Sequence, residues 1–361
     1  MKSSILACCV ITVGTAYAQS SVQLYGIVDA FGQYLNASQS VHRLQSGGLA
    51  ASRIGFRGKE DLGGGLEAFF LLEGGINLDE GTMSQGGAMF GRQSLVGLRS
   101  QTLGALSLGR HQGTLFTTGV EFSAFSSGNA GPSTAAIGGF DGYEPIRGAA
   151  SSSTPGYGPV RINNSIRYES PSLGGLKGSL LYGTGETPSS AGRSHLYDLG
   201  ARYTHGALDL IATVVSDEVR TGAGVYTTRA TTSALAGTYR LGAWRMLAGY
   251  LNFNDRRAAD QDGEGAWLGL EYRTGNILWK GQYVRSRPDQ LASSDTKAFG
   301  FGVVYELSKR TALYGSITRF SNDGNAGVGG LGRFNAALPA QLTSAGDNDI
   351  SEAVFGVRHS F

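Results

Sequence analysis

Residues 52–73 read SRIGFRGKEDLGGGLEAFFLLE, two alternating segments joined by a glycine-rich turn. In the first segment, Ile54 and Phe56 share one face, whereas Arg53 and Arg57 share the other. The second segment likewise places apolar residues at every other position after the turn. A period of two is typical of half-buried strands, and consecutive glycines favour a tight turn. This stretch therefore predicts a β-hairpin with one oily and one polar face.

Short alternating segments of the same kind continue along the chain. At roughly 9–11 residues per tilted membrane strand, sixteen such segments use about 160 residues and leave ample chain for loops. The predicted strands cover residues 21–36, 52–60, 66–73, 90–100, 105–112, 161–169, 176–183, 195–204, 207–216, 231–240, 244–254, 266–273, 277–286, 298–307, 311–321 and 351–361.

The connections between these segments alternate between short and long. Short turns on one rim and long loops on the other are typical of outer-membrane barrels. A soluble β-sandwich would not need this asymmetry and would carry more charge on its solvent-facing side. We therefore expect a closed all-β transmembrane barrel, in which closure satisfies every backbone polar group. Short turns include 205–206, 241–243, 274–276 and 308–310, and long loops include 36–51, 77–88, 254–265 and 322–350.

The composition supports a barrel. Glycine accounts for 57 of 361 residues, more than twice the usual ~7%, and charged residues make up 16% against a usual ~25%. After residue 18 no run of 18 apolar residues occurs, which argues against a transmembrane helix. A formal net charge of only +2 gives no reason to expect a nucleic acid partner.

Residues 1–18 have the layout of a secretory signal peptide. Lys2 is followed by an apolar core and by Ala16-Tyr17-Ala18, a small-x-small cleavage site. A lipoprotein site at Cys8 is the alternative, which we disfavour because little apolar core precedes that cysteine. The barrel domain is then 19–361. It contains no cysteine, so neither a disulfide nor a thiolate metal site is expected.

One long segment, residues 113–160, interrupts the rhythm of strands. It is rich in Gly, Ser, Ala and Pro and shows neither a helical nor an alternating apolar pattern. A loop of this length inside a compact chain is usually functional or disordered. Its aromatic residues and few charges favour a folded loop, and Arg110 and Arg161 bracket it. We expect it to fold into the barrel and to face these arginines.

No motif predicts catalysis, a cofactor or a metal. A Gly-x-Ser-x-Gly elbow is missing, and the five histidines lack metal-ligand spacing. The string 327–332 fits a dinucleotide fingerprint but neither follows a strand nor opens a helix. Trp244, Trp267 and Trp279 are expected in an interfacial girdle or in wall packing.

Several motifs together resemble the general porins of Gram-negative bacteria, and most closely their betaproteobacterial branch of the Burkholderia, Bordetella and Neisseria type. The resemblance covers the whole mature chain. It implies a sixteen-stranded homotrimer in the outer membrane, a passive water-filled channel, and a third extracellular loop that folds inward as the constriction. The motifs are SVQLYGIVD (21–29), SRIGFRGKEDLGGGL (52–66), FGRQ (90–93), LGR (108–110), NNSIRY (163–168), LSKRT (307–311) and the final Phe361.

In these porins a ladder of arginines on the barrel wall faces the inward loop. The matching positions are Arg53, Arg92, Arg110 and Arg161. Strand alternation independently places Arg53 and Arg161 on the polar faces of their strands. The inward direction of Arg110 depends on the resemblance, since it continues the face of two leucines.

The acids that would oppose this ladder lie in the long loop. The candidates are Glu121, Asp141 and Glu144. Enteric members carry a Pro-Glu-Phe-Gly-Gly motif in this loop, whereas only Glu121-Phe122 matches here. Fixed arginines would favour small anions without binding them tightly, as conduction requires. We therefore expect mild anion preference among small hydrophilic solutes and ions.

Two alternatives remain, a substrate-specific outer-membrane channel and a barrel adhesin that binds through its loops. The last strand ends on Phe361, which the resemblance implies is recognised by the barrel assembly machinery. Outer-membrane lipid and lipopolysaccharide are the other expected partners.

Overall fold

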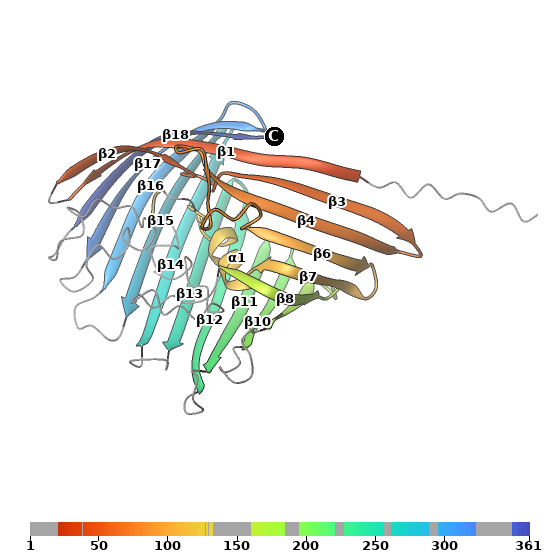
Figure 1. The fold of residues 1–361 in the computed structure, drawn as a ribbon. Helices are drawn as coiled ribbons and strands as arrows, with labels where there is room; N and C mark the ends of the chain where they lie inside the picture. The colour runs from red at the N-terminus through yellow and green to blue at the C-terminus, as the bar shows by residue number, and fades with distance from the viewer. Residues whose placement is uncertain are drawn as a thin grey trace, which may run out of the picture.

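A single antiparallel sheet closes on itself to form a barrel in the computed structural model (Figure 1). The structure describes residues 21–37, 39–126, 128, 130–132, 160–184, 195–220, 227–255, 261–288, 295–322 and 349–361. The first long strand, β1 (Ser21–Asn36), pairs with the last, β18 (Ile350–Ser360), from Ile27↔Ser360 to Asn36↔Ser351. This pairing leaves no free sheet edge, as a membrane barrel requires.

The barrel wall consists of sixteen strands, as predicted. Each wall strand pairs antiparallel with the next along the chain. After β1 they are β3 (Arg53–Gly63), β4 (Leu66–Asn77), β6 (Gln93–Ser100), β7 (Gly104–Gln112), β8 (Arg161–Glu169), β9 (Leu176–Thr184), β10 (His195–His205), β11 (Leu208–Arg220), β12 (Thr227–Leu241), β13 (Trp244–Asp255), β14 (Gln261–Thr274), β15 (Ile277–Pro288), β16 (Thr296–Glu306), β17 (Thr311–Asn322) and β18.

Two further strands do not add to this count. The strand β2 (Ser40–Ser46) pairs with β1 from Ala30 to Asn36, and β3 pairs with the same edge of β1 from Ser21 to Ile27. Together β2 and β3 form one interrupted wall strand. The prediction that residues 36–51 form a loop is therefore wrong for 40–46. The two-residue strand β5 (Thr82–Met83) pairs only with the end of β4.

The two faces of the wall differ as the alternation predicts. On β1, Val22 and Leu24 are 69% and 51% exposed on the outer face, whereas Asp29 and Gln33 are buried on the inner face. Exposed leucines, valines and aromatics recur along the outer face of the other strands. An oily outer band around a polar interior is the arrangement that a lipid bilayer stabilises.

A short helix, α1 (Thr114–Glu121), lies inside the barrel and contacts β10, β11 and β12 (Figure 1). The sequence of 113–160 shows no helical pattern, and the expectation of a segment without a helix is wrong for Thr114–Glu121. Three threonines, a valine and a glycine give the helix a low intrinsic propensity. Packing of the buried Leu115 and Phe116 against the wall stabilises it instead. In the described residues, no helix is long and apolar enough to cross a membrane.

Candidate functional site

The chain continues from α1 along the inner surface of the barrel, and we call the described residues between 114 and 132 the inner segment. The Thr114 N–H donates to Asp198 Oδ2 at 2.6 Å, where β10 meets the start of the helix. At its end, Arg245 Nη2 donates to the Glu121 carbonyl at 2.5 Å. Trp267 Nε1 donates to the next carbonyl, that of Phe122, at 2.8 Å. Three wall strands thus hold the backbone of the helix at both ends.

A glutamine of β15 clips the rest of the inner segment to the wall. Gln282 Oε1 accepts the Ala124 N–H at 2.7 Å and the Ser123 hydroxyl at 3.0 Å. Its Nε2 donates to the Pro132 carbonyl at 2.5 Å, so one side chain binds the inner segment at both 123–124 and 132. Farther along the wall, Glu352 Oε2 accepts the Gly131 N–H at 2.9 Å.

Residues 47–52, between β2 and β3, form an inner shelf on which the inner segment rests. The buried Asp29 carboxylate holds the shelf, because it accepts the N–H groups of Gly48, Leu49 and Ala50 at 3.1, 3.0 and 2.8 Å. It also accepts the Tyr314 hydroxyl at 2.5 Å. Ala130 of the inner segment lies in the apolar cluster that includes Tyr314 and contacts Leu49.

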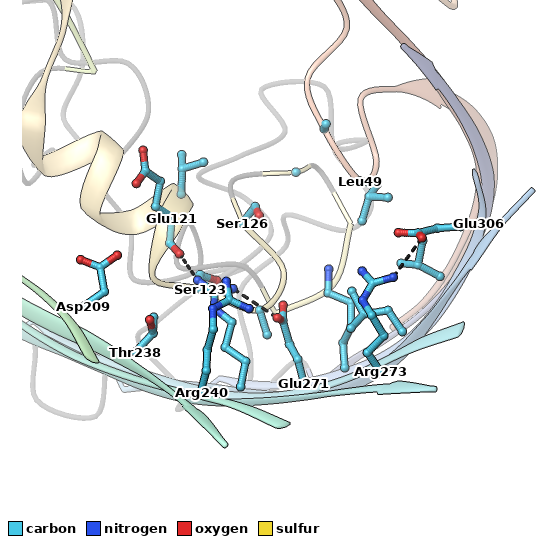
Figure 2. A pocket seen from close by; sticks show the side chains of 18 of the residues that line it. Leu49, Glu121, Ser123, Ser126, Asp209, Thr238, Arg240, Glu271, Arg273 and Glu306 are labelled. Carbon is cyan, nitrogen blue, oxygen red and sulfur yellow. Dashed lines mark hydrogen bonds and ion pairs between the residues drawn. The ribbon is translucent and has the colours of Figure 1, made fainter. Parts of the chain in front are cut away.

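A cavity of about 630 Å³ lies between the inner segment, the shelf and the wall (Figure 2). Its lining reaches the short turn at Gly206, so it opens toward the short-turn rim. Seven basic and four acidic side chains line it, a difference of three positive charges. The basic residues are Arg53, Arg202, Arg240, Arg245, Arg273, Lys280 and Arg358, and the acids are Glu121, Asp209, Glu271 and Glu306.

Each of the four acids has a basic partner within the cavity. Arg202 contacts both Glu121 and Asp209 at 2.6 Å, so one guanidinium serves two carboxylates. Arg245 contacts Glu271 at 3.2 Å, and Arg273 contacts Glu306 at 2.9 Å. In Figure 2, a dashed line marks the last of these pairs, between the labelled Arg273 and Glu306.

Three cations of the cavity form no ion pair within the described residues, namely Arg240, Lys280 and Arg358. Lys280 is 95% buried, and its Nζ lies 4.9 Å from the centre of the Phe125 ring of the inner segment. These groups therefore give the cavity its excess positive charge. None of the three was among the predicted site residues, although strand alternation places Lys280 on the inner face of β15, next to the outward Trp279.

The four predicted arginines separate into two groups. Arg53 lines the cavity, and its Nη1 lies 4.0 Å from Glu73 Oε1. Arg92 does not line the cavity. It is buried and ion-paired with the same Glu73 oxygen at 2.6 Å, and Tyr25 donates to the other oxygen at 2.9 Å. Glu73 thus brings Arg53 and Arg92 together.

The other two predicted arginines lie near the start of the long segment. Arg110 Nε donates to the Gly91 carbonyl at 2.8 Å, and its Nη1 donates to Asn163 Oδ1. The register of the β7–β8 pairing shifts between Gly109 and His111, at the position of Arg110. The Arg161 guanidinium lies 4.7 Å from the centre of the Phe116 ring of α1. Neither arginine lines the cavity of Figure 2.

Of the three predicted acids, Glu121 is described and lines the cavity at the end of α1. Asp141 and Glu144 lie outside the described residues. Within the described part of the chain, no group of three or more His, Cys, Asp or Glu side chains is arranged to hold a metal ion.

A closed sixteen-strand barrel with an oily outer band and a charged, water-accessible interior defines an outer-membrane channel. The model of the Gram-negative porin family matches residues 5–325, and the chain belongs to this family. This fold and family are those of a channel rather than an enzyme.

Individual relatives agree with the family match. Outer membrane porin protein 32 of Delftia acidovorans is 32% identical over the full length of both chains. An outer membrane porin protein of Bordetella pertussis is 28% identical and covers 87% of this chain and 93% of its own. The solved structure of an anion-selective porin from Comamonas acidovorans has a TM-score of 0.76 and 28% identity, and covers 95% of this chain and 100% of its own. The betaproteobacterial resemblance is therefore confirmed, and the protein is an outer-membrane diffusion channel.

Proposed function

We propose that this porin is mildly anion-preferring and that the cations without ion pairs in its cavity set the preference. The observation that carries the proposal is that Arg240, Lys280 and Arg358 form no ion pair with the described part of the chain, in a cavity whose acids are each paired. The related porin of Comamonas acidovorans is described as anion-selective, which supports the same direction here.

The size of the effect follows from Coulomb's law. A cation about 7 Å from a passing anion contributes about 0.6 kcal/mol in bulk water and about 2.4 kcal/mol at an effective dielectric constant of ~20. At the lower figure, one such cation favours an anion about 3-fold and three favour it about 20-fold, and screening by the electrolyte reduces this further. This range suits a conducting channel, because an ion must be able to leave its site.

The test is the reversal potential of the purified channel in a planar bilayer under a KCl gradient. The wild type should prefer chloride, and the triple variant Arg240→Gln, Lys280→Gln and Arg358→Gln should lose most of this preference. Lys309→Gln is the matched control, because Lys309 is exposed on a short turn outside the cavity. Cation preference in the wild type would refute the proposal.

The remaining parts of the proposal rest on family resemblance and on position. We infer that residues 113–160 form the constriction, with Arg53, Arg92, Arg110 and Arg161 on the wall beside it. The contacts of the inner segment support this arrangement. Residues 1–18 would be the cleaved signal peptide.

The assembled channel would be a homotrimer in contact with lipopolysaccharide and other outer-membrane lipid, inserted by the barrel assembly machinery. Threefold conductance steps in the same recordings would support the trimer. A saturable block by one solute would instead favour a substrate-specific channel.

A further inference from the structure

A glycine forms the floor of a groove on the outer face of the barrel. Gly281 of β15 pairs with Leu270 on one side and with Phe301 on the other. Along its own strand, the next outward positions are Trp279 and Tyr283. Four large side chains therefore surround a position that has no side chain.

The space above this glycine is open. A Cβ atom added at Gly281 would meet nothing within 4 Å. The surrounding side chains leave a cavity of about 580 Å³, which extends beside Leu268 and Phe299. These two residues are 63% and 61% exposed, so they stand out from the wall as the sides of the groove. The outward side chains that line it carry no charge.

One end of the groove lies at the level of the short turns. Trp244 and Tyr272, which flank short turns, contact each other with ring centroids 4.4 Å apart. Trp279 stacks on Phe301 with centroids 5.7 Å apart. Tryptophan and tyrosine favour the membrane–water interface. The groove therefore begins at the interface and runs from Trp279 past Gly281 toward the middle of the bilayer.

We propose that this groove is a binding site for an acyl chain of a membrane phospholipid. The outer face lies in the bilayer, so its neighbours are hydrocarbon chains. The hydrophobic effect does not favour lipid binding in this groove over binding elsewhere on the oily outer face, because lipid tails are as apolar as leucine. What distinguishes it is a void, whose lining gains dispersion contacts only when a flexible chain fills it. A second barrel would meet the protruding rings of Phe299 and Phe301 before it reached the floor.

The first experiment is native mass spectrometry of the protein extracted from membranes in mild detergent. Wild type should retain one phospholipid per chain, and Gly281→Phe should retain at least tenfold less because the ring fills the groove. Gly178→Phe is the matched control. Gly178 also lies on the outer face, between Leu176 and Leu180, and a Cβ atom there would meet only the Ser170 hydroxyl, at 3.8 Å. Its partner on β10 is the small Ala201, so large side chains do not enclose it as they enclose Gly281. Equal retention in wild type and Gly281→Phe would overturn the proposal.

A second measurement leaves Gly281 in place and is therefore independent of the glycine substitutions. In a Trp244→Phe variant the remaining tryptophans are Trp279 at the groove and Trp267, which is buried inside the barrel. Titration with phosphatidylcholine brominated on its acyl chains should quench Trp279 saturably, near one lipid per chain. Quenching that rises without saturation would contradict a site. Loss of oligomers in Gly281→Phe, without bound lipid in wild type, would show that a second copy occupies the groove instead.

Discussion

Replacing Gln282 by leucine should release the inner segment from the wall without weakening the barrel. Leucine is similar in size but can neither accept the Ala124 N–H and the Ser123 hydroxyl nor donate to the Pro132 carbonyl. A buried polar group left without a partner costs about 1–3 kcal/mol, so the two backbone groups alone would cost about 2–6 kcal/mol. Water in the lumen can hydrogen-bond to the released groups, which keeps the cost near the lower end of this range. A cost of about 2 kcal/mol still increases the population of detached states roughly 30-fold.

Single-channel recording measures this release directly. Wild type should conduct steadily, whereas Gln282→Leu should show excess current noise and additional conductance levels. Ser316→Ala is the control, because Ser316 also lies on the inner face and its hydroxyl makes no hydrogen bond among the described residues. The midpoint of thermal unfolding should change little, because the ladders between wall strands remain intact. Noise equal to that of the wild type and Ser316→Ala would refute the role of Gln282.

Three further substitutions test other contacts. Glu73→Gln leaves the buried Arg92 without its anionic partner, which should cost about 3–5 kcal/mol and lower the thermal unfolding midpoint; an unchanged midpoint would argue against this. Tyr314→Phe removes a hydrogen bond to the Asp29 carboxylate, a cost of about 1.5–3 kcal/mol, and should raise current noise through the shelf; quiet channels would contradict it. Phe361→Ala should reduce the amount of assembled channel in membranes more than its yield on refolding in detergent, and equal surface levels would count against an assembly role.

The strands were predictable where alternation is strong on both faces. The bounds of β1 and β8 agree with the prediction, because one face of each strand lies in an apolar environment and the other face in a polar one. The strand β2 was missed because SVHRLQS contains only two apolar residues among polar ones. Such a segment is typical of a loop, and only its register with β1 shows that it extends the wall.

The site was harder to predict than the wall because its parts meet only in three dimensions. Gln282 and Ser123 are 159 residues apart in the chain, so no local motif connects them. Strand alternation does predict an inward Lys280, but it cannot show that the neighbouring acids already have partners. The arginine ladder implied by the family resemblance includes Arg53, which lines the cavity. The resemblance could not predict that Glu73 would bind Arg92.

The pairing of the cavity acids predicts how selectivity responds to loss of an acid. Glu306 contacts Arg273 at 2.9 Å, and both side chains are partly exposed to the cavity. Glu306→Gln leaves Arg273 charged but without its partner, so the excess of basic over acidic lining residues rises from three to four. The reversal potential in a KCl gradient should therefore move toward that of chloride. Arg273→Gln should shift it in the opposite direction, because the same pair then leaves a carboxylate in the path. If both substitutions moved the reversal potential in the same direction, the charge of this cavity would not control selectivity.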